Sequence, residues 1–205
     1  MLPGLDGSGN VPGMQRVSFL RAALLAGLIA GLAACLLAGC KPAPPVPTLY
    51  ENKQVGLRFN PSPGWDVAEK TEAGCAFAVE ATKGQDLHFL ICISPPRPEI
   101  LFTENTFVSC ENVKEYIRQA LKGVRPTCDP GGAGGHFGYD TLYARLLQSG
   151  DRARVQFVNH LFMPVKGRLV QVMAYSIGDD DKKAHALFDK NRPALFDMMG
   201  SVRVR

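Results

Sequence analysis

The pattern of apolar and polar positions changes near residue 40 and then settles into short runs separated by turn residues. These runs are rich in β-branched and aromatic residues, and Gly and Pro interrupt them, as is typical of antiparallel strands. Lys83 and Gly84 fall in the turn of an expected hairpin. The strands predicted in this part of the chain are 55–59, a second one beginning at 65–68, 75–81 and 87–94.

A helix is predicted at 110–122, where apolar residues recur at a spacing that places them on one side of a helix. Ser109 is the expected N-cap, and Gly123 is expected to end the helix. The apolar stripe consists of Val113, Tyr116, Ile117, Ala120 and Leu121.

The chain that follows predicts a Gly-rich loop at 124–138 and then a meander of three antiparallel strands. Ser149-Gly150-Asp151 and Lys166-Gly167 supply the turns between these strands. The three strand-like runs are 139–148, 152–163 and 167–177.

A second helix is predicted at about 181–199, with Asp179-Asp180-Asp181 as its cap. Pro193 is expected to kink this helix or divide it in two, because proline removes a backbone hydrogen bond. Residues 202–204 then form an edge strand. The predicted fold class is α+β, a mostly antiparallel sheet with one helix in mid-chain and one near the C-terminus.

The first 39 residues have the pattern of an export signal. Arg16 and Arg21 precede an uncharged apolar stretch from Ala22 to Gly39. Positive charge followed by an apolar run and small residues is typical of secretory signals. Met14 is an alternative initiator, since it would place Arg16 close to the N-terminus.

The end of this stretch, Leu37-Ala38-Gly39-Cys40, resembles the lipobox of bacterial lipoproteins. Leu37 suits an apolar peptidase pocket, Ala38 and Gly39 are small enough to pass the active site, and the Cys40 thiol takes a diacylglyceryl group. Two or three acyl chains, at ~0.8 kcal/mol per buried CH₂, hold a protein on a membrane. The alternative is a transmembrane anchor, since about eighteen helical residues span ~27 Å.

Residues 40–48 are interpreted as the lipidated cysteine and a Pro-rich spacer, which leaves 49–205 as the folded domain. A Pro-rich segment is semi-extended at ~3.1 Å per residue, so the spacer would hold the domain roughly 20 Å from the lipid. Lys41 occupies the position where, in enterobacteria-like sorting, Asp retains lipoproteins in the inner membrane. Its presence favours the outer membrane.

Composition supports one globular domain after the leader. The chain of 205 residues is 46% apolar and 20% charged, and Asp6, Arg16 and Arg21 are the charged residues of the first 40. The rest carries 21 basic and 18 acidic side chains, a net charge of +3, and these are interspersed. The sequence therefore predicts no nucleic-acid partner.

An even number of cysteines in an exported domain suggests disulfides. If the turn at Lys83-Gly84 lies at the centre of a hairpin, paired positions sum to 167, and Cys75 falls opposite Cys92. Cys110 and Cys128 then pair across the following helix and its return loop. The alternative is that all four are buried free thiols. No Cys-x-x-Cys occurs, so neither a thioredoxin-like motif nor a zinc knuckle is available.

The order of these elements resembles the PsbP/Mog/DcrB-like proteins over about residues 49–205. The resemblance rests on a Val-Gly-Leu-Arg-Phe strand, a Pro-Ser-Pro-Gly-Trp turn ending at Trp65, then hairpin, helix, meander and a terminal helix ending in Ser-Val-Arg-Val. It implies a central antiparallel sheet flanked by helices. It also implies protein contact as the shared role, as in extrinsic photosystem subunits, a Ran-binding protein, secretion-effector chaperones and envelope lipoproteins. It implies no reaction.

The sequence supplies weak candidates for chemistry. No His-x-x-x-His pair and no Gly-x-Ser-x-Gly elbow occurs. The glycines of 131–135 lack the Gly-Lys-Ser/Thr of a phosphate loop, and Asp179–Asp181 is a better helix cap than a Ca²⁺ site because Lys182 and Lys183 follow it. We assign no catalytic residue, cofactor or metal ligand. The four histidines are His88, His136, His160 and His185.

The apolar cluster Ile100-Leu101-Phe102 follows a run of prolines and is a candidate partner-binding patch, with a short packed helix as the alternative. The leading hypothesis is a membrane-tethered, non-enzymatic protein-binding or assembly module of the cell envelope. Two other hypotheses are a periplasmic hydrolase or transferase with an unrecognised site and a purely structural envelope lipoprotein.

Overall fold

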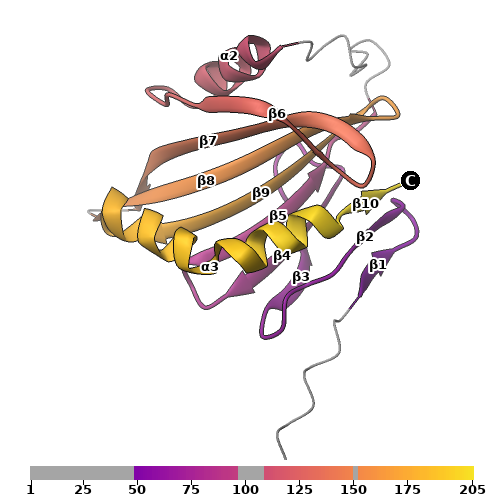
Figure 1. Cartoon of the computed structure of the whole chain (residues 1–205), viewed down its shortest axis with the longest axis horizontal. Coiled ribbons are helices and arrows are strands. Elements are labelled where there is room, and N and C mark those ends of the chain that lie inside the picture. Colours follow the sequence, from indigo (N-terminus) through magenta and orange to yellow (C-terminus); the bar gives the residue numbers. More distant parts are fainter. Residues whose placement is uncertain (1–48, 97–108, 150–151) are drawn as a thin grey trace, which may run out of the picture. The chain divides into compact units, whose positions relative to one another are not determined.

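The computed structural model describes residues 49–96, 109–149 and 152–205. They form a large sheet, a small sheet and two helices (Figure 1). The described residues belong to one compact unit.

The large sheet is antiparallel throughout and contains seven strands. Its last three strands in sequence form the predicted meander. The chain reverses direction between them where Gly and charged residues interrupt the apolar runs. In sheet order the strands are β3 (Asp66–Lys70), β4 (Phe77–Lys83), β5 (Leu87–Ile93), β9 (Arg168–Gly178), β8 (Arg152–Val165), β7 (His136–Ser149) and β6 (Thr127–Ala133).

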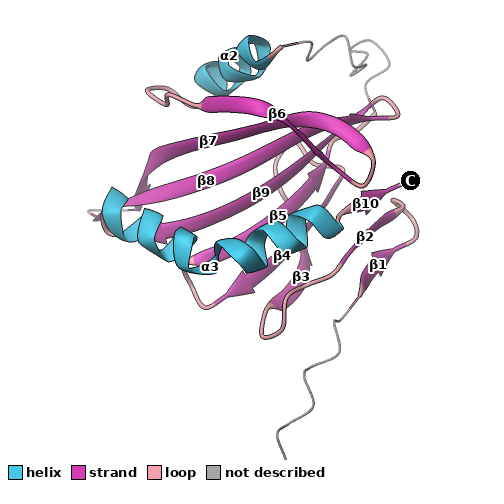
Figure 2. Ribbon diagram, viewed as in Figure 1, coloured by secondary structure: helices cyan, strands magenta, loops and turns pink. Residues whose placement is uncertain are grey.

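The sheet lies between the two helices. In β8, Leu161 and Met163 pack in the cluster that contains the buried side of α3 (Asp181–Ser201). Val158 and Phe162 pack with the buried side of α2 (Cys110–Ala120). Because successive residues of a strand point to opposite faces, α2 and α3 cover opposite faces of the sheet (Figure 2). The α+β class with a central antiparallel sheet flanked by helices is confirmed.

The small sheet joins the two ends of the domain. It consists of β1 (Tyr50–Asn52), β2 (Leu57–Phe59) and β10 (Arg203–Val204), with β2 in the centre. Leu57 and Phe59 are fully buried in the main core, whereas Arg58 between them points to solvent. This alternation places one face of the small sheet on the core and leaves the other face charged.

Both helices begin where their capping residues predict. The Ser109 side chain accepts a hydrogen bond from the backbone N–H of Asn112, and the Asp180 side chain accepts one from Lys183. These bonds satisfy backbone donors that have no partner within the helix. The acidic run at 179–181 is therefore a helix cap.

The expected loop at 124–138 is wrong over most of its length. Residues 127–133 form edge strand β6, which pairs along β7 through a tight turn at Gly134-Gly135. Pro130 is tolerated because an edge strand does not need every backbone N–H. A Cβ on Gly132 would lie 2.2 Å from the carbonyl oxygen of His136. Glycine is therefore required here for close packing of two strands.

The expected division of the C-terminal helix at Pro193 is also wrong. Helix α3 continues from Asp181 to Ser201 with Pro193 inside it. Phe188, Leu195 and Met198 lie on both sides of the proline and are fully buried. A proline inside a helix costs about 3 kcal/mol, in part because it removes a backbone hydrogen bond. The packing of these side chains on the sheet outweighs that cost.

Replacing Gly138 by alanine should destabilise the domain by about 1–3 kcal/mol, the usual cost of overpacking. The added Cβ would lie 2.3 Å from the carbonyl oxygen of Phe162, in the neighbouring strand β8. Gly200→Ala is the matched control, because nothing lies within 4 Å of its Cβ and alanine favours the helix. Urea denaturation measures both variants, and equal stability of the two would contradict the close strand packing.

Candidate functional site: a cation-lined groove

The β4–β5 hairpin carries the first disulfide. Cys75 and Cys92 are bonded, with their Cα atoms 5.5 Å apart. The predicted pairing is therefore present, but the predicted register is wrong, because paired positions sum to 170 and Ala78 lies opposite Cys92. The hairpin turn contains three residues, 84–86, whereas the predicted register requires an even number. Cys75 lies before the start of β4 and is bonded to Cys92 from there.

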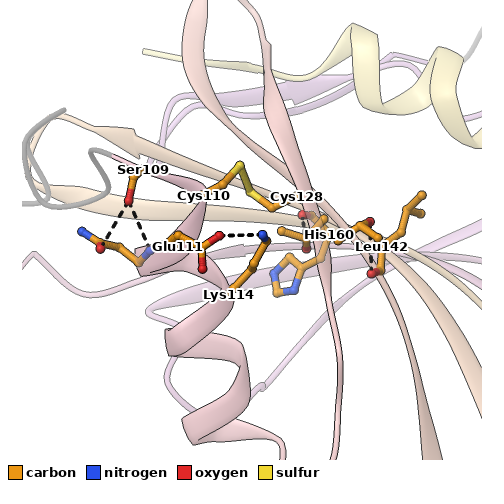
Figure 3. The surroundings of a disulfide bond; sticks show 10 residues. Ser109, Cys110, Glu111, Lys114, Cys128, Leu142 and His160 are labelled. Carbon is orange, nitrogen blue, oxygen red and sulfur yellow. Dashed lines mark hydrogen bonds and ion pairs between the residues drawn. A yellow bond between two sulfur atoms is a disulfide. The ribbon is translucent and has the colours of Figure 1, made fainter.

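The second disulfide joins the start of α2 to strand β6. Cys110 and Cys128 are bonded, with Cα atoms 5.5 Å apart (Figure 3). Both cysteines contact the cluster in which Val113 and Ile117 of α2 pack on the sheet. The bond thus fastens the helix to an edge strand, and the alternative of four free thiols is wrong for the structure.

The histidines lie at four separate places in the fold. His88 is on β5, His136 begins β7, His160 is on β8 and His185 is on α3. In the described part of the chain, no three His, Cys, Asp or Glu side chains gather in a way that could hold a metal. Among these residues the structure therefore offers no histidine-based metal centre.

His88 belongs to a closed network around Glu80. Its Nδ1 lies 3.1 Å from Oε1 of Glu80 and its Nε2 lies 3.1 Å from the carbonyl oxygen of Gln85. The Tyr175 hydroxyl and the Lys70 ammonium also donate to Glu80, at 2.8 and 3.3 Å. Because both ring nitrogens are engaged within the protein, this cluster is structural.

The hydrogen bonds around Glu80 shift its acidity. The hydrogen bond from His88 is the largest cause that lowers the pKa of Glu80, and the hydrogen bond from Tyr175 and the charge of Lys70 lower it further, to about 2. Burial acts in the opposite direction. Burial, followed by the interaction with Glu80, raises the pKa of Tyr175. The carboxylate therefore stays ionised at every physiological pH.

His160 is buried beneath α2 and has no access to a substrate. Its exposed fraction is 6%, and its Nδ1 lies 3.1 Å from the Tyr143 hydroxyl, while its Nε2 has no partner among the described residues. Burial lowers the pKa of His160 to about 3, so the ring is neutral. A neutral, enclosed imidazole is a packing residue of the core.

A groove lies between the small sheet and one end of the large sheet. Its volume is about 630 Å³, within the roughly 300–1,000 Å³ of ligand pockets. The β1–β2 turn, the β8–β9 turn and β10 lie together at this end of the molecule, to the right in Figure 1. The apolar residues of the groove are Val55, Leu57, Ile93, Val165, Val170 and Val204.

Five cations and one acid line this groove. None of the five forms an ion pair with a described residue. Glu51 is the single acidic side chain of the lining. The cations are Lys53, Arg58, Lys166, Arg168 and Arg205.

The positive surface continues beyond the groove. Across the small sheet, Glu51, Arg58 and Arg203 are directly paired in one row, so their side chains share its outer face. A second hollow, lined by Leu49 and Arg203 among others, shares Arg58 with the groove. We call the five groove cations together with Arg203 the cationic belt; it extends to Leu49, where the described chain begins.

The groove has side chains that suit anion binding. The lining holds Lys, Arg, Gln and Glu but no Ser, Thr, Cys, His, Asp or Tyr. It therefore contains no hydroxyl or thiol nucleophile. Unpaired guanidinium and ammonium groups beside an apolar floor can hold phosphate or carboxylate groups.

The sequence did not single out any residue of the cationic belt. Its members lie far apart along the chain, at 53–58, 166–168 and 203–205, and only the folded sheets bring them together. Of the residues that the sequence did single out, Trp65 is buried in the core, as expected. The lipobox residues Leu37, Ala38, Gly39 and Cys40 and the patch Ile100, Leu101 and Phe102 lie outside the described residues.

Comparison with known proteins gives a fold and no family. No family model and no curated protein matches the chain. Among solved structures, it is similar to cyanobacterial PsbP (CyanoP) from Synechocystis sp. PCC 6803, with a TM-score of 0.52 and 16% identity over 82% of this chain and 98% of that chain. The chain has a PsbP-like fold. At this identity, the likeness extends to the fold alone.

Two further structures are more distant. PA94 from Pseudomonas aeruginosa, a protein of unknown function, is 13% identical with a TM-score of 0.44 over 78% of this chain and 97% of that chain. LpqN, involved in cell envelope biogenesis of Mycobacterium tuberculosis, is 10% identical with a TM-score of 0.42 over 78% and 90%. Neither described helix of this PsbP-like chain is long and apolar enough to cross a membrane.

Replacing Glu80 by Gln should lower the free energy of unfolding at pH 7 by on the order of 2 kcal/mol. A carboxylate with a depressed pKa stabilises the fold above its unfolded pKa, and this stabilisation is lost as the pH falls from about 4.5 to about 2. The difference between wild type and variant should therefore shrink through that window in pH-dependent urea denaturation.

Glu115→Gln is the control, because Glu115 makes only exposed contacts, an ion pair with Arg118 and a hydrogen bond from Gln119, and the change should alter stability by under about 0.5 kcal/mol. A Glu80→Gln deficit that stays constant down to pH 2 would contradict the stabilising role of the ionised carboxylate.

Proposed function

We propose that the chain is a bacterial lipoprotein that acts as a non-enzymatic protein-binding or assembly module of the cell envelope. In this proposal the chain is exported, cut before Cys40 and held by lipid on that cysteine, with the domain on the periplasmic side. Lys41 after the anchor favours the outer membrane. The Pro-rich spacer separates the anchor from the domain at residue 49.

The cation-lined groove is the observation that carries the binding role. Its volume is about 630 Å³, and its side chains can hold a negatively charged partner but supply no hydroxyl or thiol nucleophile. The other polar clusters of the domain, around Glu80 and His160, are closed by internal hydrogen bonds or buried. This distribution of side chains supports binding over a hydrolase or transferase.

The PsbP-like fold supports the proposal only in a general way, since a fold hosts many functions. The lipobox-like sequence supports the location, because a cysteine follows Leu37-Ala38-Gly39 at the end of an apolar run. Both are consistent with an envelope protein that meets its partner outside the cytoplasm.

Replacing Cys40 by alanine should abolish labelling of the protein by radioactive palmitate and leave the precursor uncut. The thiol is the atom that would carry the diacylglyceryl group, and cleavage depends on that group. Cys35→Ala is the matched control, because Cys35 lies within the same apolar run and should be discarded with the leader. Normal lipid labelling of the Cys40→Ala protein would sink the anchoring proposal.

Crosslinking of intact cells should recover one discrete envelope protein with the lipidated chain. The Cys40→Ala variant should lose that adduct, because its uncut leader would keep the domain at the inner membrane and away from a partner at the outer one. Mass spectrometry identifies the crosslinked species. Recovery of no specific partner, together with high abundance of the chain, would instead favour a purely structural lipoprotein.

A further inference from the structure

We propose that the cationic belt binds the phosphate groups of anionic phospholipids, so that the domain docks on the membrane surface that anchors it. The inference rests on the proposed lipid anchor and adds a second membrane contact, made by the folded domain itself. Four observations carry it: the charge of the belt, its lack of ion pairs with described residues, its position near the start of the domain and the length of the tether.

The charge of the belt is not balanced within the domain. Glu51 is the only acid among the side chains that line the groove, and it forms no ion pair with a described residue. Arg58 and Arg203 lie directly opposite each other on adjacent strands, a pairing that repels unless an anion lies between or above them. The belt therefore has unused capacity for several anionic groups.

One end of the belt lies at the point where the tether joins the domain. Leu49 is the first described residue, and it lines the same hollow as Arg58 and Arg203. Its side chain is 55% exposed, which leaves an apolar group at the margin of the cations. Apolar side chains beside cations are the combination that binds the interfacial region of a bilayer.

The tether keeps this side of the domain near the lipid. Residues 41–48 are Pro-rich, and a segment of that length at about 3.1 Å per residue reaches roughly 25 Å. A domain of this size has a diameter on the order of 40 Å. Because the tether is shorter than the domain, the side at Leu49 is the one held closest to the membrane.

The apolar floor of the groove favours a lipid over a simple inorganic anion. Val55 and Val204 are only half-buried at the groove, and their side chains offer no polar group to a bound phosphate. A headgroup phosphate between the Arg and Lys side chains would place its glycerol or acyl carbons over these residues. The chemistry recognised is thus a phosphate attached to an apolar body.

The test is lysine footprinting on the full-length lipidated protein in nanodiscs, one set of phosphatidylcholine and one with about 30% phosphatidylglycerol. Lys53 and Lys166 belong to the belt, whereas Lys190 lies exposed on α3 outside it. We expect acetylation of Lys53 and Lys166 to be roughly three- to tenfold slower in the anionic discs, with Lys190 unchanged. This protection should disappear at about 1 M salt, where the Debye length is about 3 Å.

The variant Arg58→Gln/Arg168→Gln should remove the protection, and Arg125→Gln, an exposed arginine outside the groove, should keep it. Equal lysine reactivity in the two kinds of disc would overturn the proposal, as would protection that neutral discs give equally well. Protection in whole envelopes but not in phosphatidylglycerol discs would assign the belt to an acidic protein partner instead. If inorganic phosphate protects the lysines as strongly as the anionic discs do, the belt is a site for free anions, and this result would also overturn the proposal.

The same sample separates this inference from the anchor on which it rests. Mass spectrometry of the N-terminal peptide reports whether Cys40 carries acyl chains. Acylated Cys40 with unprotected lysines refutes membrane docking and leaves the proposed lipoprotein intact. A free Cys40 thiol refutes the anchor, and the docking proposal falls with it.

Discussion

Burial of both faces of strands β8 and β9 is the constraint on which the rest of the structure depends. Helix α3 covers one face and helix α2 covers the other, so neighbouring residues such as Leu161 and Phe162 belong to different halves of the core. A one-residue slip would exchange these two sets of side chains. The register is therefore fixed along the whole meander, and with it the place where each strand ends.

The charged groove follows from where these buried strands stop. Charged side chains are costly to bury, so many of them lie at the turns and at the strand ends. Lys166 and Arg168 flank the β8–β9 turn, and the small sheet brings Arg58 and Arg205 to the same end. Tertiary structure thus assembles a positive surface from residues that are unremarkable in sequence.

Local sequence signals predicted the elements that depend on local chemistry. The Ser109 and Asp180 caps, the meander and both disulfide pairings agree with the structure. What failed depends on tertiary packing: β6 is a strand despite its glycines because β7 pairs along it, and α3 passes through Pro193 because it is packed on the sheet. The groove could not be predicted, since no local pattern reveals which distant cations will meet.

The two membrane contacts proposed for this chain would act on different scales. Acyl chains determine whether the protein is attached, through a hydrophobic term that salt does not screen. The cationic belt acts only within a Debye length of about 8 Å, too short a range to recruit a protein from solution. Once an anchor holds the domain near the surface, however, weak contacts act at a high effective concentration. Electrostatics that would be negligible for a free domain can then determine which side faces the lipid and which side, including α3, stays available to a protein partner.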